Sequence, residues 1–360
     1  MKVVLSSLVI LFGTSVFAQN CLKFSEMPPD FAQAFHDNFD KHVEIFGAHL
    51  VATPSVSDAG ALHAAGILAQ WIDNDEDGIA DNPTIVGEMA SVDATIVMFD
   101  YPDSDEFEDF IVDLESELAD PWSLALQDLY DEETHPGGSS QSEGFDASLE
   151  ECLHLVTHYG YASAYPTEFG EQIGSTLADA MDIARGGQFE SIPNNYPEEA
   201  WYHYDDQTCD YGCMATEYIY WGLTSLLGGQ NYPGRCNEID NEWELCEPVE
   251  FAATDVALQA LITNSQYYMP TILPDGMYCV ATDVKEIERE LNIWPNPVKD
   301  MLYVDVPIQV SEVIVIDSLG RIAYNVGVAG AETIQINVAG WPNGLYTVRV
   351  GNSVQVITKH

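Results

Sequence analysis

The chain has 360 residues, and 59 Asp or Glu against 11 Lys or Arg give it a formal net charge of −48 at pH 7. So acidic a surface repels nucleic acid and anionic membranes, which excludes both as partners. The length allows more than one domain, and the apolar stretches are too short for a membrane span.

The first 18 residues have the pattern of a secretory signal peptide. Lys2 precedes an apolar run, and small residues surround Ala18, after which we expect cleavage. Export permits disulfides, and all seven cysteines follow Ala18. Closeness in the sequence favours the pairs Cys209–Cys213 and Cys236–Cys246, and Cys21–Cys279 would tie the ends of the main domain. Cys152 is left over as a small buried hydrophobe.

Residues 19–290 carry six Lys or Arg and 54 Asp or Glu, and their apolar residues recur mostly at helical spacing. Helix starts are indicated at Ser57 and at Thr254–Asp255, whereas "ATIVMF" predicts a strand. Residues 131–146 are acidic and rich in Gly and Ser, which predicts a loop. We therefore expect an α+β main domain that is mainly helical, with a small sheet. The helical segments are "FAQAFHDNFDKHVEIFG", "SDAGALHAAGILAQWID", "LEECLHLVTHYG", "GSTLADAMDIARG", "MATEYIYWGLTSLLG" and "TDVALQALITN".

The segment "DNDEDGIADNP" predicts a calcium loop. Hard cations need several oxygens in a tight turn, which Gly78 permits. Thr84 stands where an EF-hand has its bidentate Glu, so the loop is not an EF-hand; it resembles the D-x-D-x-D-G-x-x-D loops of thrombospondin type 3 repeats. Its structural role would be to fix the end of the helix that finishes at Ile72. The expected ligands are Asp73, Asp75, Asp77, the backbone carbonyl of Ile79, and Asp81.

The segment "EECLHLVTHYGY", residues 150–161, suggests a second metal site. His154 and His158 would lie about 40° apart on one helix face, and Glu150 and Glu151 precede them by one turn. Imidazoles four residues apart are the usual zinc pair on a helix. Leu155, however, occupies the place of the catalytic Glu of an H-E-x-x-H motif.

A third ligand has to come from another segment. Glu217 stands on an otherwise apolar, aromatic helix, where a buried carboxylate needs a partner. These two helices resemble those of gluzincin metallopeptidases, a resemblance that implies a zincin-like fold and a Glu ligand on the later helix. Reserve ligands are available in "WYHYDDQ": His203, Asp205 and Asp206.

Two arrangements would supply a base. In one, His154 and His158 bind the ion; in the other, Glu150 replaces the first His of the motif and binds with His154. Both leave Glu151 as the base that activates metal-bound water.

The tail, residues 291–360, alternates apolar and polar residues in short runs separated by turns, which predicts a small β-sandwich. "IWPNPVKDMLYVDV", "VIVIDSLGRIAYN" and "WPNGLYTVRVGNSVQVITKH" resemble the type A C-terminal sorting domain of the type IX secretion system. The resemblance implies an immunoglobulin-like sandwich, the secretion machinery as partner, and passage through the periplasm to the medium or the cell surface.

The sequence thus predicts a signal peptide (1–18), an acidic metal-binding domain (19–290) and a sorting domain (291–360). The favoured function is a secreted, calcium-stabilised metalloprotein with a zinc site, a hydrolase acting on peptides. The alternative is a non-catalytic calcium-binding surface or adhesion protein, in which the histidine helix belongs to the core.

Overall fold

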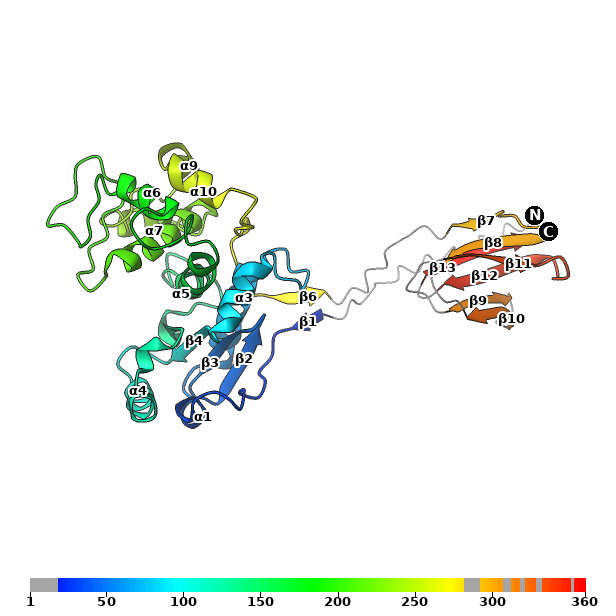
Figure 1. Ribbon diagram of the computed structural model, residues 1–360, viewed down its shortest axis with the longest axis horizontal. Helices are drawn as coiled ribbons and strands as arrows, with labels where there is room; N and C mark the ends of the chain where they lie inside the picture. The colour runs from blue at the N-terminus through cyan, green and yellow to red at the C-terminus, as the bar shows by residue number, and fades with distance from the viewer. Residues whose placement is uncertain (1–18, 282–291, 307–311, 318–320, 328–331, 351–352) are drawn as a thin grey trace, which may run out of the picture. The chain divides into compact units, whose positions relative to one another are not determined.

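The computed structural model describes residues 19–281, 292–306, 312–317, 321–327, 332–350 and 353–360. They form a main unit, Gln19–Ala281, and a tail unit that starts at residue 292 (Figure 1). The expected signal peptide and the expected boundary between residues 290 and 291 lie outside the described residues.

The main unit contains a mixed four-stranded sheet in the order β2-β3-β4-β5, of which Figure 1 labels the first three strands. The β2–β3 pair is antiparallel, and the β3–β4 and β4–β5 pairs are parallel. β5 is therefore an edge strand of the described sheet. The strands are β2 (Lys41–Ile45), β3 (Ala48–Ala52), β4 (Thr95–Phe99) and β5 (Leu126–Tyr130).

Alternate strand residues face two apolar clusters, as the period of a β-strand requires. Val51, Val97 and Phe99 contribute to one cluster together with α1 (Gln33–Asn38) and α4 (Asp105–Glu117). Leu50, Ile96, Met98 and other residues of the strands face the larger cluster, to which most of the remaining helices contribute. These helices are α2 (Asp58–Ile72), α3 (Pro83–Ser91), α5 (Ser148–Leu155), the π-helix η3 (Val156–Ala162), α6 (Thr176–Ala184), α7 (Tyr211–Leu226), α8 (Arg235–Glu238), α9 (Pro248–Thr254) and α10 (Val256–Ile262).

Several local predictions are confirmed. The Ser57 side chain caps α2 by accepting from the Gly60 amide at 3.0 Å, and α2 ends at Ile72. Asp255 caps α10 in the same way through the Leu258 amide. All three expected disulfides form, and Cys152 is free and buried. The Cys21–Cys279 bond joins β1 (Gln19–Cys21) to β6 (Cys279–Ala281), which pair as antiparallel strands.

The predicted helix over residues 31–47 is wrong after Asn38. The chain there forms β2, turns through Phe46 and Gly47, and returns as β3. Both turn residues have positive φ, 53° and 86°, which is the backbone of a two-residue hairpin turn. The sequence does not predict this turn, because Asn or Asp usually occupies the first turn position, which is Phe46 here.

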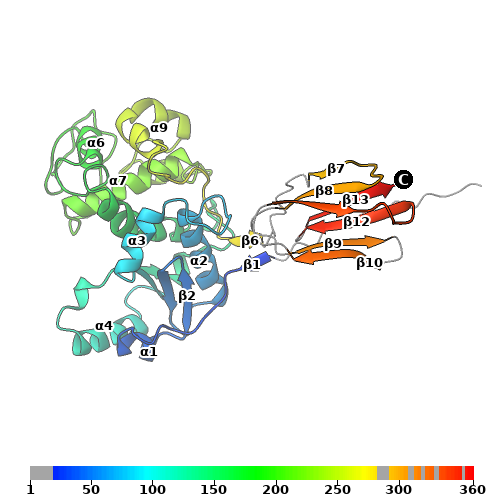
Figure 2. The ribbon, with the colours of Figure 1, turned by 45° about the vertical axis from the view of Figure 1, so that its right-hand side comes forward.

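The tail unit consists of antiparallel strands in two sheets, β10-β9-β12-β13 and β11-β8-β7 (Figures 1 and 2). Leu302 and Val304 of one sheet and Val315 and Val348 of the other share one buried apolar cluster. The predicted α+β class, with an all-β tail, is confirmed. The strands are β7 (Ile293–Trp294), β8 (Met301–Val306), β9 (Glu312–Asp317), β10 (Ile322–Gly327), β11 (Glu332–Asn337), β12 (Gly344–Val350) and β13 (Ser353–Lys359).

Candidate metal centre

Three predicted ligands converge between α5 and α7: Glu150, His154 and Glu217. One ligand atom from each lies within 4.8 Å of the other two. Glu150 and His154 are one turn apart on α5, and Glu217 comes from α7, whose first turn is capped by the Asp210 carboxylate. The structure thus brings together the second of the two expected arrangements, in which Glu150 replaces the first His.

The imidazole of His154 has an unsatisfied edge. The residue is only 6 % exposed, and its Nε2 atom has no hydrogen-bond partner among the described residues. Nε2 lies 3.6 Å from Glu217 Oε2, and the ring packs edge-on against Tyr220. A buried nitrogen without a partner is costly, and a bound ion at this point would satisfy it.

His158 does not join this group. Its side chain is 49 % exposed, and its Nδ1 atom lies 2.7 Å from Glu171 Oε2. The helix changes at Val156 to the wider π form, with i→i+5 hydrogen bonding, so the two histidines no longer follow regular α-helical spacing. Glu171 also accepts a hydrogen bond from Thr216 on α7, so His158 belongs to a separate polar contact.

Glu151 lies at the other edge of the His154 ring. Its Oε2 atom is 3.4 Å from His154 Nδ1 and accepts a hydrogen bond of 2.6 Å from Gln127 Nε2 on β5. A carboxylate on Nδ1 orients an imidazole that binds a metal through Nε2. The role of Glu151 as a base, which would have to reach metal-bound water, stays a prediction.

The electrostatics of the group favour a bound cation. Burial, followed by the carboxylate of Glu217, raises the pKa of Glu150 well above its usual value, and burial also raises that of Glu217. Burial alone would lower the pKa of His154, but the carboxylates of Glu217 and Glu151 raise it to about 10. Burial and the Glu151 carboxylate raise the pKa of nearby Glu133 to about 7. The protein therefore gathers more carboxylates here than a single imidazolium neutralises.

The acidic loop after α2 forms a second group. Asp73, Asp75 and Asp81 offer oxygens within 4.8 Å of one another. Asp77 is outside this group, and its Oδ1 atom accepts from the amide of Ile79. The position of the Ile79 carbonyl as a ligand stays a prediction.

Backbone contacts hold this loop in a tight turn. Asp73 is fully buried and accepts from the Gly78 amide at 2.8 Å and from the Tyr278 hydroxyl at 2.5 Å. Glu76 and Gly78 have φ of 55° and 84°, the left-handed conformation that such a turn needs. Burial and the neighbouring aspartates raise the pKa of Asp81, as expected for carboxylates brought together without a cation.

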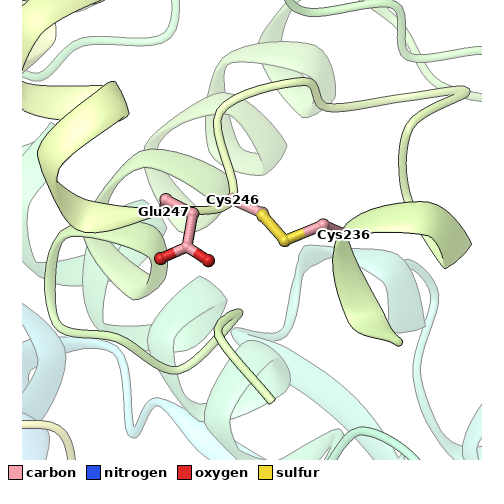
Figure 3. A group of neighbouring side chains, drawn as sticks. All are labelled: Cys236, Cys246 and Glu247. Atoms are coloured by element: carbon pink, nitrogen blue, oxygen red, sulfur yellow. A yellow bond between two sulfur atoms is a disulfide. The ribbon is translucent and has the colours of Figure 1, made fainter. Parts of the chain in front are cut away.

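A third group of side chains does not fit a metal. Cys236, Cys246 and Glu247 lie together, but Figure 3 shows the two sulfur atoms joined as a disulfide. A disulfide has no thiolate to offer, so this group is structural.

The reserve ligands are outside the group of Glu150, His154 and Glu217. Several neighbours of that group were not predicted from the sequence. His203 Nε2 lies 2.9 Å from the Ala200 carbonyl, and Asp206 bonds the turn at Thr208. Gln127 had no sequence signal, because it reaches Glu151 from the distant strand β5. Tyr204 and Tyr220, which interact with Glu217 and Glu150, stand in aromatic runs typical of a core.

Residues 292–360 match the family described as the secretion system C-terminal sorting domain. The tail is therefore a type IX sorting domain, and the protein is secreted or displayed at the cell surface with the secretion machinery as its partner. The match does not extend to the main unit, so it gives no support to the resemblance to gluzincin metallopeptidases. No match was found among curated proteins. Among the residues that the structure describes, no helix is long and apolar enough to cross a membrane.

Proposed function

We propose that the protein is an exported metalloprotein whose main unit binds one zinc-type ion through Glu150, His154 and Glu217. The buried, unpartnered Nε2 atom of His154, which faces Glu217, carries this proposal. Imidazole nitrogen and carboxylate oxygen are zinc ligands, and three protein ligands leave a fourth position for water or substrate. The three ligands come from two separate helices, α5 and α7.

The open position suggests hydrolysis, with peptides as substrates. A bound ion would polarise a water molecule or a carbonyl oxygen. Glu150 in place of a His puts one more carboxylate on the ion than the H-E-x-x-H motif does. Glu151 as the base stays a prediction, and its contact with His154 Nδ1 supports a positioning role as well.

Metal analysis with a matched pair of histidine variants tests the proposal. The purified chain should hold about one zinc after dialysis, and His154→Ala should lose it. His158→Ala is the control, since its imidazole contacts Glu171 and it should retain the metal. Zinc retained by His154→Ala, or lost only from His158→Ala, would contradict the ligand set.

Glu151→Gln separates binding from chemistry. The amide keeps the shape of the side chain and removes its basicity. If Glu151 is the base, the variant keeps its zinc and loses cleavage of a mixed peptide library. Unchanged cleavage would rule out the base, and absence of cleavage by the native protein would leave a site that only binds metal.

A second candidate function is calcium binding by a non-catalytic surface protein. The cluster of Asp73, Asp75 and Asp81 supports it, because three carboxylates on one turn suit a hard cation. Calorimetric titration with calcium should detect one site, and Asp75→Asn should weaken it. Calcium bound without zinc would favour this function over the first.

A further inference from the structure

An aromatic pocket with a cavity of about 240 Å³ lies at the free edge of the main sheet. Phe99 of β4 and Phe107 and Phe110 of α4 contribute to its lining. Trp122, 73 % exposed on the short 3-10 helix η1 (Pro121–Ser123), and Tyr159 of η3 complete the aromatic walls. The pocket is on the face of the sheet that packs against α1 and α4.

The charges that line this pocket have one sign. Glu115 and Asp128 contribute carboxylates, and among the described residues no Lys, Arg or His lines it. The Tyr130 hydroxyl donates to Asp128 Oδ2 at 2.5 Å, which fixes the orientation of that carboxylate. An anionic ligand would meet these carboxylates and the acidic surface around them, so a cation is favoured.

The size of the cavity limits the ligand to a small group. Sites for drug-sized ligands measure roughly 300–1,000 Å³, so this pocket suits a single side chain or a small amine. Aromatic rings pack against an apolar stem and attract a cation at their faces.

We propose that the pocket binds an organic ammonium group on an apolar stem. The ammonium pairs with Asp128 and Glu115 while the stem lies among the rings. The pocket is separate from the metal centre, because Leu126 and Asp128 line it whereas Gln127, between them, reaches Glu151 on the other face of β5. Ammonium binding therefore requires no metal.

The test compares three ligands of similar shape by calorimetry on the mature chain. Phenethylamine should bind about tenfold more tightly than 2-phenylethanol, the gain expected from a cation–π contact and a carboxylate, and 3-phenylpropionate should not bind. The double variant Glu115→Gln/Asp128→Asn should reduce the amine to the affinity of the alcohol. Trp122→Ala should weaken both, whereas Val112→Ala, an exposed control on α4, should change neither.

A further pair of ligands identifies the source of the ammonium group. Binding of Nα-acetyl-lysine amide as tightly as phenethylamine would indicate lysine side chains of peptides, and binding of phenethylamine alone would indicate free aromatic amines. Equal affinity of amine and alcohol, tighter binding of the carboxylate, or a double variant that retains the amine preference would overturn the proposal.

Discussion

Zinc binding at the candidate centre should depend strongly on pH, because His154 must lose a proton before its Nε2 atom can bind an ion. In the metal-free protein the pKa of this imidazole is raised to about 10, so the ring is protonated at pH 7. The raised pKa of Glu150 adds to the protons that an ion must displace. At least one proton should therefore be released for each zinc bound at neutral pH.

The magnitude follows from the distance between pH 7 and a pKa of about 10. At pH 7 the ion must displace one proton from a ring whose pKa is about three pH units higher. This weakens zinc binding about a thousandfold, or about 4 kcal/mol, relative to a neutral ring. The apparent affinity should rise at least about tenfold for each pH unit and level off near the pKa of His154. The affinity rises with pH because the neighbouring carboxylates stabilise the protonated ring, and the ion must displace that proton.

Calorimetry in two buffers of different ionisation enthalpy measures the proton release directly. Glu151→Gln removes one of the carboxylates that raise the pKa of His154, so it should shift the pH dependence to lower pH. His158→Ala serves as the control and should leave proton release unchanged. Zinc binding without proton release at pH 7, or an affinity that is constant between about pH 6 and 8, would refute the reasoning.

Three further predictions concern stability. About 1 mM calcium should stabilise the main unit by about 1 kcal/mol if the loop binds as weakly as most extracellular sites, and melting curves of Asp75→Asn should not respond to calcium or chelator. Replacing Cys21 and Cys279 by Ser should cost about 5 kcal/mol in urea unfolding, because the bond spans 258 residues; a cost below about 2 kcal/mol would contradict the loop-entropy argument. Burial, followed for His42 by the facing His49, lowers the pKa of both imidazoles below 6.5, so the folded state binds fewer protons than the unfolded state. Stability should therefore be complete above about pH 6.5 and decline below it, and His49→Gln should reduce that decline in unfolding titrations.

Features that depend on local spacing could be predicted from the sequence. The short pairs Cys209–Cys213 and Cys236–Cys246, the cap at Ser57 and the alternating strands of the tail each depend on residues close in the chain. Glu150 in the three-member group could also be predicted, since it stands one turn before His154, at the first position of the motif.

Features that depend on tertiary contacts could not be predicted. β2 and β3 contain the buried residues His42 and His49, whose ring nitrogens are hydrogen-bonded to each other at 3.0 Å. This bond allows two polar side chains in buried strands, and the sequence alone does not reveal it. Phenylalanines at residues 31, 35 and 39 have helical spacing, yet the helix ends before the last of them, which packs against the sheet. The π-helix that begins at Val156 and contains His158 has no recognisable pattern in the sequence.

The bond between Cys21 and Cys279 makes nearly the whole main unit one covalent ring. A protease that cuts the chain once between these cysteines produces two pieces that remain a single molecule. Two cuts are needed before a fragment can leave, and other disulfides or packing still retain many such fragments. Outside the cell, where secreted proteases are present, a single cut in a surface loop therefore does not release any part of the main unit.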